Sequence, residues 1–161
     1  MKFYVLVPCF NEFRTIKKII NSLLKIKLNL KIILVDDGST DGTKEIISKE
    51  VKKKIYKFIN LKKNYGKGYA INKCKKYIKN NSLVIIQDAD LEYNPNDYYK
   101  IYNYYVKNKN INVIYGSRFL NKSFSKIYQS FGGSIIRIFG NKFLTFFSNL
   151  LNNQKLTDAH T

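Results

Sequence analysis

The chain has 161 residues, which is about one domain and long enough to bury a hydrophobic core. Hydrophobic residues make up 45% and charged residues 25%, as in an ordinary globular protein, and the formal net charge is +18. Two cysteines, Cys9 and Cys74, exclude a disulfide framework and a metal knuckle. The apolar runs are shorter than the roughly 18 residues of a membrane-spanning helix, and no secretory signal is recognisable, so we expect a cytoplasmic protein.

The predicted elements alternate between short apolar runs of strand length and longer segments with helical spacing. In chain order they are a strand at 3–8, a helix at 12–26, a strand at 31–37, a helix capped by Thr40 or Asp41 and ending near 49, a strand at 55–60, a helix at 65–79, a strand at 83–87, a helix from Pro95 to about 106 and a strand at 111–116. This order predicts an α/β fold, with a mainly parallel, Rossmann-like sheet that has helices on both faces.

The pattern changes after residue 118. Residues 131–151 place large apolar side chains at steps of three or four, which predicts one amphipathic helix, or two helices joined near Gly140. Two interpretations remain open. The helix packs against the sheet, or it lies at a membrane surface with its phenylalanines facing the lipid and its flanking lysines near anionic head groups.

The positive charge favours polyanionic partners such as anionic lipid or phosphorylated substrates. A solvated lysine-rich surface is the alternative for any single run, for example Lys52–Lys54. Because no nucleic-acid reading motif is present, we expect no nucleic-acid partner.

Polar clusters follow almost every predicted strand, where ligands bind in open α/β sheets. In the stretch QDADLEYNP, the side chains of Asp88, Asp90 and Glu92 are two residues apart and would share one direction in an extended chain. Hard carboxylate oxygens beside a strand end suit Mg²⁺ or Mn²⁺ bridging to phosphate, although a D-x-D pattern alone is also typical of a solvated turn.

Three further features add to this predicted site. In VDDGSTDGT, Gly38 and Asp41 fit a tight turn and a helix cap, while a carboxylate at the strand tip can accept hydrogen bonds from a base or ribose. In NYGKGYA, Lys67 stands between two glycines at a helix start, which is typical either of a phosphate cradle or of close packing. Arg118 is a candidate for a bidentate phosphate contact.

Together the motifs VPCFNE, VDDGSTDGT, NYGKGYA, QDADLEYNP, GSRF and LTD resemble, in order and spacing, the family 2 glycosyltransferases with the GT-A fold. The likeness is strongest to polyprenyl-phosphate sugar transferases of the dolichyl-phosphate mannose synthase type. It implies one domain overall, with a nucleotide-sugar-binding core at 1–120 and an acceptor-side, membrane-proximal helical segment at 121–161 that is apparently truncated, because relatives continue beyond LTD.

The resemblance also implies an activity. The enzyme would move a sugar, with inversion, from a GDP-mannose or UDP-glucose type of donor to a polyprenyl phosphate, using Mg²⁺ or Mn²⁺. The reaction would take place at the cytoplasmic face of the membrane, where the protein would be peripheral and would contact an anionic surface, with a membrane partner subunit as a further candidate. A phosphate acceptor needs no general base at neutral pH, which agrees with the single histidine.

The roles implied by the resemblance are assigned by motif. The nucleotide-sugar-binding residues would be Pro8, Phe10, Glu12, Asp37, Lys67, Asp88 and Arg118. The metal ligands would be Asp88, Asp90 and Glu92, and the catalytic residues would be Asp90, Arg118 and, where a base is required, Asp158. Phe10 stands where the family usually has tyrosine, so a stacking face is kept and a hydroxyl is lost.

Two alternatives remain open. The acceptor is a glycan or glycolipid hydroxyl in cell-surface polysaccharide synthesis, in which case a general base is needed. Otherwise the chain is a truncated remnant that binds nucleotide sugar without turnover.

Overall fold

The computed structural model describes residues 2–108, 110–117, 119, 123–130 and 132–158, and Arg118 therefore lies outside the described residues. The chain divides into two compact units, residues 1–100 and 101–161. The predicted functional division at residue 120 stays a prediction.

The first unit is built on a parallel sheet whose four strands have the order β3-β2-β1-β4. The strands are β1 (Lys2–Cys9), β2 (Leu30–Asp36), β3 (Lys57–Asn60) and β4 (Ser82–Ile86). All four were predicted, because each is a nearly continuous apolar run. The strands β1 and β2 are the most buried, whereas Val84 and Ile86 of β4 are 39% and 50% exposed. The central strand β1 is almost fully buried, and it pairs Val5 with Ile32 on one side and with Ile85 on the other.

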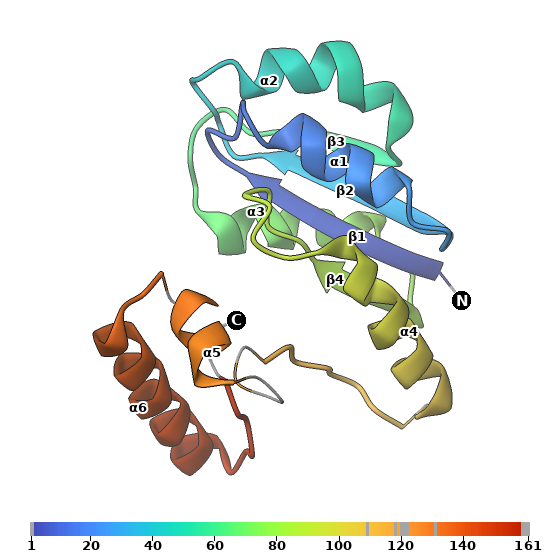
Figure 1. The fold of residues 1–161 in the computed structure, drawn as a ribbon. Helices are drawn as coiled ribbons and strands as arrows, with labels where there is room; N and C mark the ends of the chain where they lie inside the picture. The colour runs from blue at the N-terminus through green and yellow to red at the C-terminus, as the bar shows by residue number, and fades with distance from the viewer. Residues whose placement is uncertain (1, 109, 118, 120–122, 131, 159–161) are drawn as a thin grey trace. The chain divides into compact units, whose positions relative to one another are not determined.

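The strand order determines which face each helix covers. The chain steps from β1 to β2 to β3 in one direction and then crosses back to β4, so right-handed crossovers place the helices on opposite faces. Helix α1 (Ile16–Leu24) and the short α2 (Thr43–Ile46) lie over one face, and α3 (Lys67–Cys74) lies over the other (Figure 1). On the α3 face, Ala70 and Cys74 pack with Tyr4, Leu6 and other buried strand residues.

Several helices differ in extent from the predicted ranges. Helix α1 begins at Ile16 because residues 13–15 form a turn, and α2 continues as a π-helical turn, Ile47–Val51, and a 3-10 turn, Lys52–Lys54. A 3-10 turn, Lys75–Tyr77, extends α3. Pro95 begins a 3-10 turn, Pro95–Asp97, that leads into α4 (Tyr98–Lys107), as its predicted place in a first turn requires.

The second unit corrects the prediction of a fifth strand. Residues 111–117 form no regular secondary structure, and Val113 and Tyr115 are exposed, at 61% and 58%. A run such as INVIY has the composition of a strand, but a strand forms only where a neighbouring edge accepts its hydrogen bonds, and composition does not report that.

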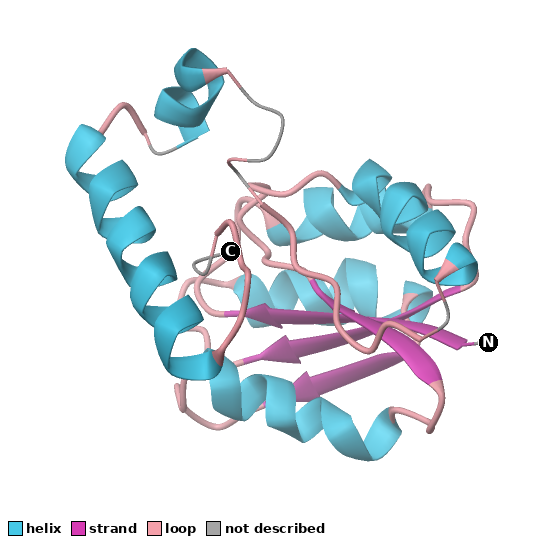
Figure 2. Ribbon diagram, turned by 90° about the horizontal axis from the view of Figure 1, so that it is seen from below, coloured by secondary structure: helices cyan, strands magenta, loops and turns pink. Residues whose placement is uncertain are grey.

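The predicted C-terminal helix is present as α6 (Ile135–Asn152), after a short helix α5 (Phe124–Ser130) that was not predicted (Figure 2). Gly132 and Gly133 have positive φ, and the Ser134 side chain caps the helix by accepting from the Arg137 N–H at 3.4 Å, so α6 starts at 135. It runs through Gly140 without a break. Among the described residues, none of the helices is long and apolar enough to cross a membrane.

Helix α6 is amphipathic, as predicted, but its apolar stripe is the exposed one. Its exposed large side chains recur at helical spacing: Ile136, Phe139, Phe143, Phe146 and Leu150. The buried positions are Ile138, Asn141 and Thr145, two of which are polar and hydrogen-bonded.

Candidate functional site

A cavity of about 320 Å³ opens at the carboxyl ends of the strands, where the polar clusters were expected to meet. It brings together predicted residues from four separate loops: Pro8, Phe10, Glu12, Asp37, Lys67, Asp88 and Asp90. Four further residues that were not predicted as ligand contacts also line it: Cys9, Asn64, Gly66 and Ala89.

The loops after β1 and β2 are joined by hydrogen bonds beside this cavity. The Asn11 N–H donates to Ser39 Oγ at 2.9 Å, and Asn11 Oδ1 accepts from the Thr40 N–H at 2.9 Å. The Glu12 N–H donates to Thr43 Oγ1 at 2.8 Å. Asn11 has a positive φ of 57°, a left-handed conformation that asparagine adopts more readily than most residues. The two loops therefore act as one structural unit.

Asp41 ties the same loops together. Its Oδ2 accepts from the Phe13 N–H at 3.1 Å, and its Oδ1 accepts from the Thr43 N–H at 3.0 Å and the Thr43 hydroxyl at 2.5 Å. Burial alone would raise the pKa of Asp41, but the bonds from Thr43 and Phe13 outweigh it, so the pKa lies below its usual value.

A lowered pKa means that Asp41 stabilises the fold in its charged form. The contribution is complete above the usual aspartate pKa and is lost as the pH falls through the lowered value. We expect Asp41→Ala to reduce the free energy of unfolding by about 1 kcal/mol at pH 7 and to flatten the loss of stability in acid. Thermal unfolding followed from pH 7 to pH 3 measures both effects. The control is Glu45→Ala, which removes an exposed carboxylate from α2. If both variants lost stability equally between pH 7 and pH 3, the stabilising role of the charged Asp41 would be contradicted.

Asp37 lines the cavity and also has backbone partners that were not predicted. Its side chain is buried, and its two carboxylate oxygens accept from the backbone N–H groups of Tyr65 and Gly66, at 3.0 and 2.8 Å. Asp37 therefore holds the start of α3 against the strand tip, and it also lines the cavity. Gly66 has φ +91 and ψ 155, a conformation that glycine adopts readily and other residues avoid.

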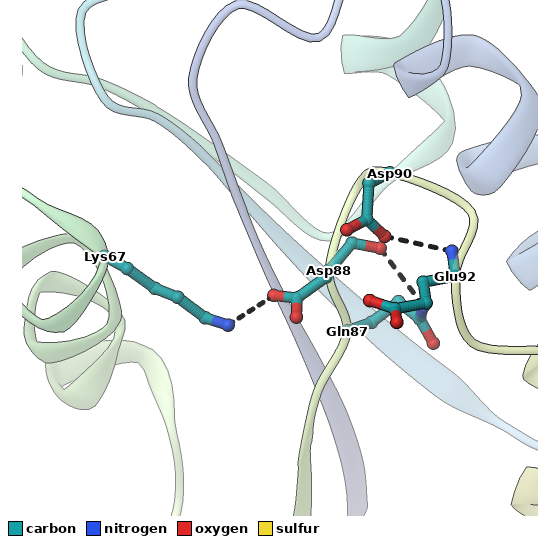
Figure 3. A network of polar contacts seen from close by, with 5 residues as sticks. All are labelled: Lys67, Gln87, Asp88, Asp90 and Glu92. Atoms are coloured by element: carbon teal, nitrogen blue, oxygen red, sulfur yellow. Dashed lines mark hydrogen bonds and ion pairs between the residues drawn. The ribbon is translucent and has the colours of Figure 1, made fainter. Parts of the chain in front are cut away.

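Lys67 and Asp88 connect the start of α3 to the loop after β4. The Lys67 Nζ lies 2.6 Å from Asp88 Oδ1, and both side chains are part of the cavity lining (Figure 3). The pair is partly exposed, so solvent screens it and its contribution to stability is small. Its relevance is positional, because it places a cation and an anion side by side in the cavity lining, as a site for a phosphate and a cation requires.

Gln87 positions the acidic loop and was missed from the sequence. It is buried, and its Nε2 donates to the carbonyl oxygens of Asp88 and Tyr93, at 3.1 and 3.4 Å. Its Oε1 accepts from the Tyr98 hydroxyl at 2.7 Å, and burial raises the pKa of Tyr98, which keeps that hydroxyl a donor. The sequence did contain a sign of this role, because Gln87 is a polar residue at the end of an apolar run.

The three acidic side chains of this loop do not all share one environment. Asp88 and Asp90 line the cavity, whereas Glu92 is exposed and outside the lining. Asp90 Oδ1 accepts from the Glu92 N–H at 3.0 Å, and Leu91 has a positive φ of 69°, so the chain turns and the strand alternation ends (Figure 3). Within the described ranges, no cluster of three acidic, histidine or cysteine side chains is arranged to hold a metal ion.

Asp88 and Asp90 nevertheless fit part of a Mg²⁺ or Mn²⁺ site. Both supply hard oxygen ligands to the same cavity, and such ions are usually bound by one or two carboxylates together with substrate phosphates and water. The assignment of Glu92 as a third ligand stays a prediction.

Cys9 lines the cavity without the properties of a nucleophile. Its thiol donates to the Val35 carbonyl at 3.4 Å, and burial, together with the nearby Asp36 carboxylate, raises its pKa. The thiol is therefore neutral and structural.

Asp158, the predicted base, belongs to the second unit. It is buried there, and its Oδ1 accepts from Asn141 Nδ2 of helix α6 at 2.9 Å.

Comparison with known proteins adds a family to this geometry. Residues 4–159 match the family described as glycosyl transferase family 2. The chain is 32% identical over 120 residues to the poly-beta-1,6-N-acetyl-D-glucosamine synthase of Staphylococcus epidermidis, an alignment that covers 73% of this chain and 29% of that enzyme. The chain thus spans less than a third of the length of this relative.

Solved structures show the same fold. TarS residues 1–349 of S. aureus, in complex with UDP-GlcNAc, aligns with a TM-score of 0.59 and 25% identity, over 75% of this chain and 39% of that one. A mannosyltransferase of Pyrobaculum calidifontis, in complex with GDP-Man and Mn²⁺, aligns with a TM-score of 0.50 and 24% identity, over 55% and 27%, and shows the fold alone. The four-stranded parallel sheet with its flanking helices is a GT-A domain, and the chain belongs to glycosyl transferase family 2.

Proposed function

We propose that this chain transfers N-acetylglucosamine from UDP-N-acetylglucosamine to a hydroxyl group of a cell-surface glycan. The observation that carries the proposal is the cavity at the strand ends, where an aromatic ring, a lysine and two aspartates from separate loops come together. The choice of sugar is supported by the names of two relatives, one a poly-N-acetylglucosamine synthase and the other solved with UDP-GlcNAc.

Four side chains of the cavity lining have a role in the proposed reaction. Phe10 is 42% exposed and offers a ring face to the uracil base. The Lys67 ammonium faces the diphosphate and stabilises the charge that grows on it as the bond from the anomeric carbon to the phosphate oxygen breaks. A Mg²⁺ or Mn²⁺ ion held by Asp88 and Asp90 would supply further charge neutralisation to the same leaving group.

This proposal and the polyprenyl-phosphate hypothesis differ in the group that accepts the sugar. A glycan hydroxyl must lose its proton as it attacks, so a base is needed, and Asp158 is the predicted one. A polyprenyl phosphate is the second candidate, favoured by the exposed phenylalanines of α6, which suit an acceptor dissolved in an anionic membrane.

An acceptor panel tests the proposal. The chain, with UDP-N-acetylglucosamine and Mg²⁺ or Mn²⁺, is given a β-linked glucosamine oligosaccharide or a short polyprenyl phosphate, and UDP release and labelled product are measured. We expect transfer to the oligosaccharide and its loss in EDTA. Transfer to the lipid alone would overturn the assigned acceptor, and calorimetric binding of the donor without turnover on either acceptor would identify a nucleotide-sugar-binding remnant.

A further inference from the structure

The loop that carries Asp88 and Asp90 is closed at its base by two buried side chains. Gln87 precedes the loop and Tyr98, the first residue of α4, follows it. The Tyr98 hydroxyl donates to Gln87 Oε1 at 2.7 Å, and both side chains are buried. Residues 88–97 therefore form a loop whose two ends are joined by a buried hydrogen bond, and we call Gln87 and Tyr98 the loop clip.

Both halves of the loop clip are attached to the central strand β1. The Gln87 N–H donates to the Leu6 carbonyl at 2.9 Å, so the pairing with β1 continues one residue beyond β4. The Tyr98 ring lies against the Phe3 ring, with 5.9 Å between the two ring centroids. Because β1 is buried and is paired on both sides, these contacts give the loop a rigid base.

From this base the Gln87 amide holds the loop at two places. Its Nε2 donates to the Asp88 carbonyl at 3.1 Å (Figure 3) and to the Tyr93 carbonyl at 3.4 Å. The backbone is thus fixed on both sides of Asp90. Carbonyl oxygens only accept, so the amide must turn its nitrogen to the loop and its oxygen to the Tyr98 hydroxyl, which donates. The hydroxyl therefore stabilises the amide orientation that the loop needs.

The loop depends strongly on this arrangement, because most of it is in contact with solvent. Residues 90–92, 94, 96 and 97 are exposed, and Leu91 has a positive φ of 69°. Without the Tyr98 hydroxyl, the Gln87 oxygen would be a buried acceptor that lacks its donor, which is unfavourable. The amide would have to turn or admit water, and its bonds to the loop would weaken.

We propose that Tyr98 is a positioning residue for donor binding, which acts through Gln87 to keep Asp88 and Asp90 in the arrangement that binds a diphosphate and its cation. Tyr98 itself does not line the cavity. If the loop is in place in a fraction of the free molecules, the apparent Kd rises by the inverse of that fraction, while the bound state is unchanged. The inference rests on the proposed function for the choice of UDP as ligand, whereas the order of the loop can be measured without a ligand.

The test compares Tyr98→Phe with Tyr4→Phe in the 161-residue chain. Tyr98→Phe keeps the ring against Phe3 and removes the hydroxyl. Tyr4→Phe is the matched control, because it removes a buried hydroxyl that has no hydrogen-bond partner within the described part of the chain. In calorimetry with UDP and Mn²⁺, we expect the Kd to rise about tenfold for Tyr98→Phe and less than about twofold for Tyr4→Phe.

Two further measurements separate positioning from a loss of folded protein. Amide hydrogen exchange of the free protein is expected to be about tenfold faster at residues 88–94 in Tyr98→Phe, with unchanged protection in β1 and β2. In the transfer assay, the KM for UDP-N-acetylglucosamine should rise about tenfold, while kcat at saturating donor stays within about twofold. A smaller folded fraction would lower the apparent kcat instead.

A second variant tests whether Tyr98 acts through Gln87. Gln87→Met keeps the length of the side chain and removes its hydrogen bonds, so we expect it to raise the Kd at least as much as Tyr98→Phe. The double variant should bind no more weakly than Gln87→Met alone. Additive effects, or unchanged exchange and Kd in Tyr98→Phe, would overturn the proposal. If the wild type does not bind UDP, the proposed function fails, and faster exchange confined to Tyr98→Phe would still support the loop clip.

Discussion

Replacing Asp90 with alanine is expected to lower the rate of sugar transfer by about a hundredfold or more, because one of the two cavity carboxylates that fit a divalent cation is lost. The side chain is exposed and accepts one backbone hydrogen bond, from the Glu92 N–H at 3.0 Å, so the change should leave the fold intact. The measurement is kcat with UDP-N-acetylglucosamine at saturating Mg²⁺, together with circular dichroism.

Two further variants separate charge from loop geometry. Asp90→Asn keeps an oxygen for the Glu92 N–H but removes the charge, so we expect it to be as slow as the alanine variant. Asp97→Ala removes an exposed carboxylate that pairs with Lys100 at 2.7 Å and does not line the cavity, and its rate should stay within about twofold of the wild type. Full activity in Asp90→Ala would refute a role of the carboxylate in transfer. If Asp90→Asn were as active as the wild type, the role of Asp90 would be limited to its hydrogen bond with the Glu92 N–H.

Gly38→Ala is expected to reduce the free energy of unfolding by about 3 kcal/mol or more, through backbone strain and a clash together. Gly38 has φ +75, and a Cβ there would lie 2.4 Å from the Lys63 carbonyl carbon and 2.8 Å from the Asn64 nitrogen. These contacts are backbone atoms that cannot rotate away. The loop that carries Asn64 to Gly66 along the cavity would have to move, so donor affinity should fall as well.

A glycine series provides the controls, measured by urea unfolding. Gly66 has φ +91, but a Cβ at this position would meet open space, so Gly66→Ala should lose about 1–3 kcal/mol from strain alone. Gly68 is inside α3 with open space and no positive φ, so Gly68→Ala should be neutral or stabilising by up to about 1 kcal/mol. If Gly38→Ala reduced the free energy of unfolding no more than Gly66→Ala does, the backbone of Lys63 would be shown to move aside at little cost.

The sequence was most informative about the sheet. Four strands were predicted within about two residues, because each is a nearly continuous apolar run bounded by polar residues. The segment at 111–116 has the same composition and forms no strand, because pairing depends on a partner edge elsewhere in the chain. Likewise, the break before α6 depends on Gly132 and Gly133, whose positive φ the apolar periodicity does not report.

For the site, the rule that ligands bind at the strand ends was enough to bring residues 8, 10, 12, 37, 67, 88 and 90 to one cavity. The sequence did not reveal that Asp37 binds the backbone of Tyr65 and Gly66, or that Lys67 pairs with Asp88. These are contacts between residues about 20 to 30 positions apart, and they depend on how the loops pack. Gly38 was predicted as a turn glycine, and its contact with Lys63 adds a second requirement for the same residue.

The hydrogen bonds that join the loops after β1 and β2 limit how the cavity can change during evolution. Asn11 depends on Ser39 and Thr40, and Glu12 on Thr43, so a substitution in one loop removes a partner from the other. Neither loop is free to diversify alone, although they are separated by nearly 30 residues in the chain. Changes of donor preference in this lineage should therefore come through paired replacements across the two loops, or through the loop after β4, which these bonds leave independent.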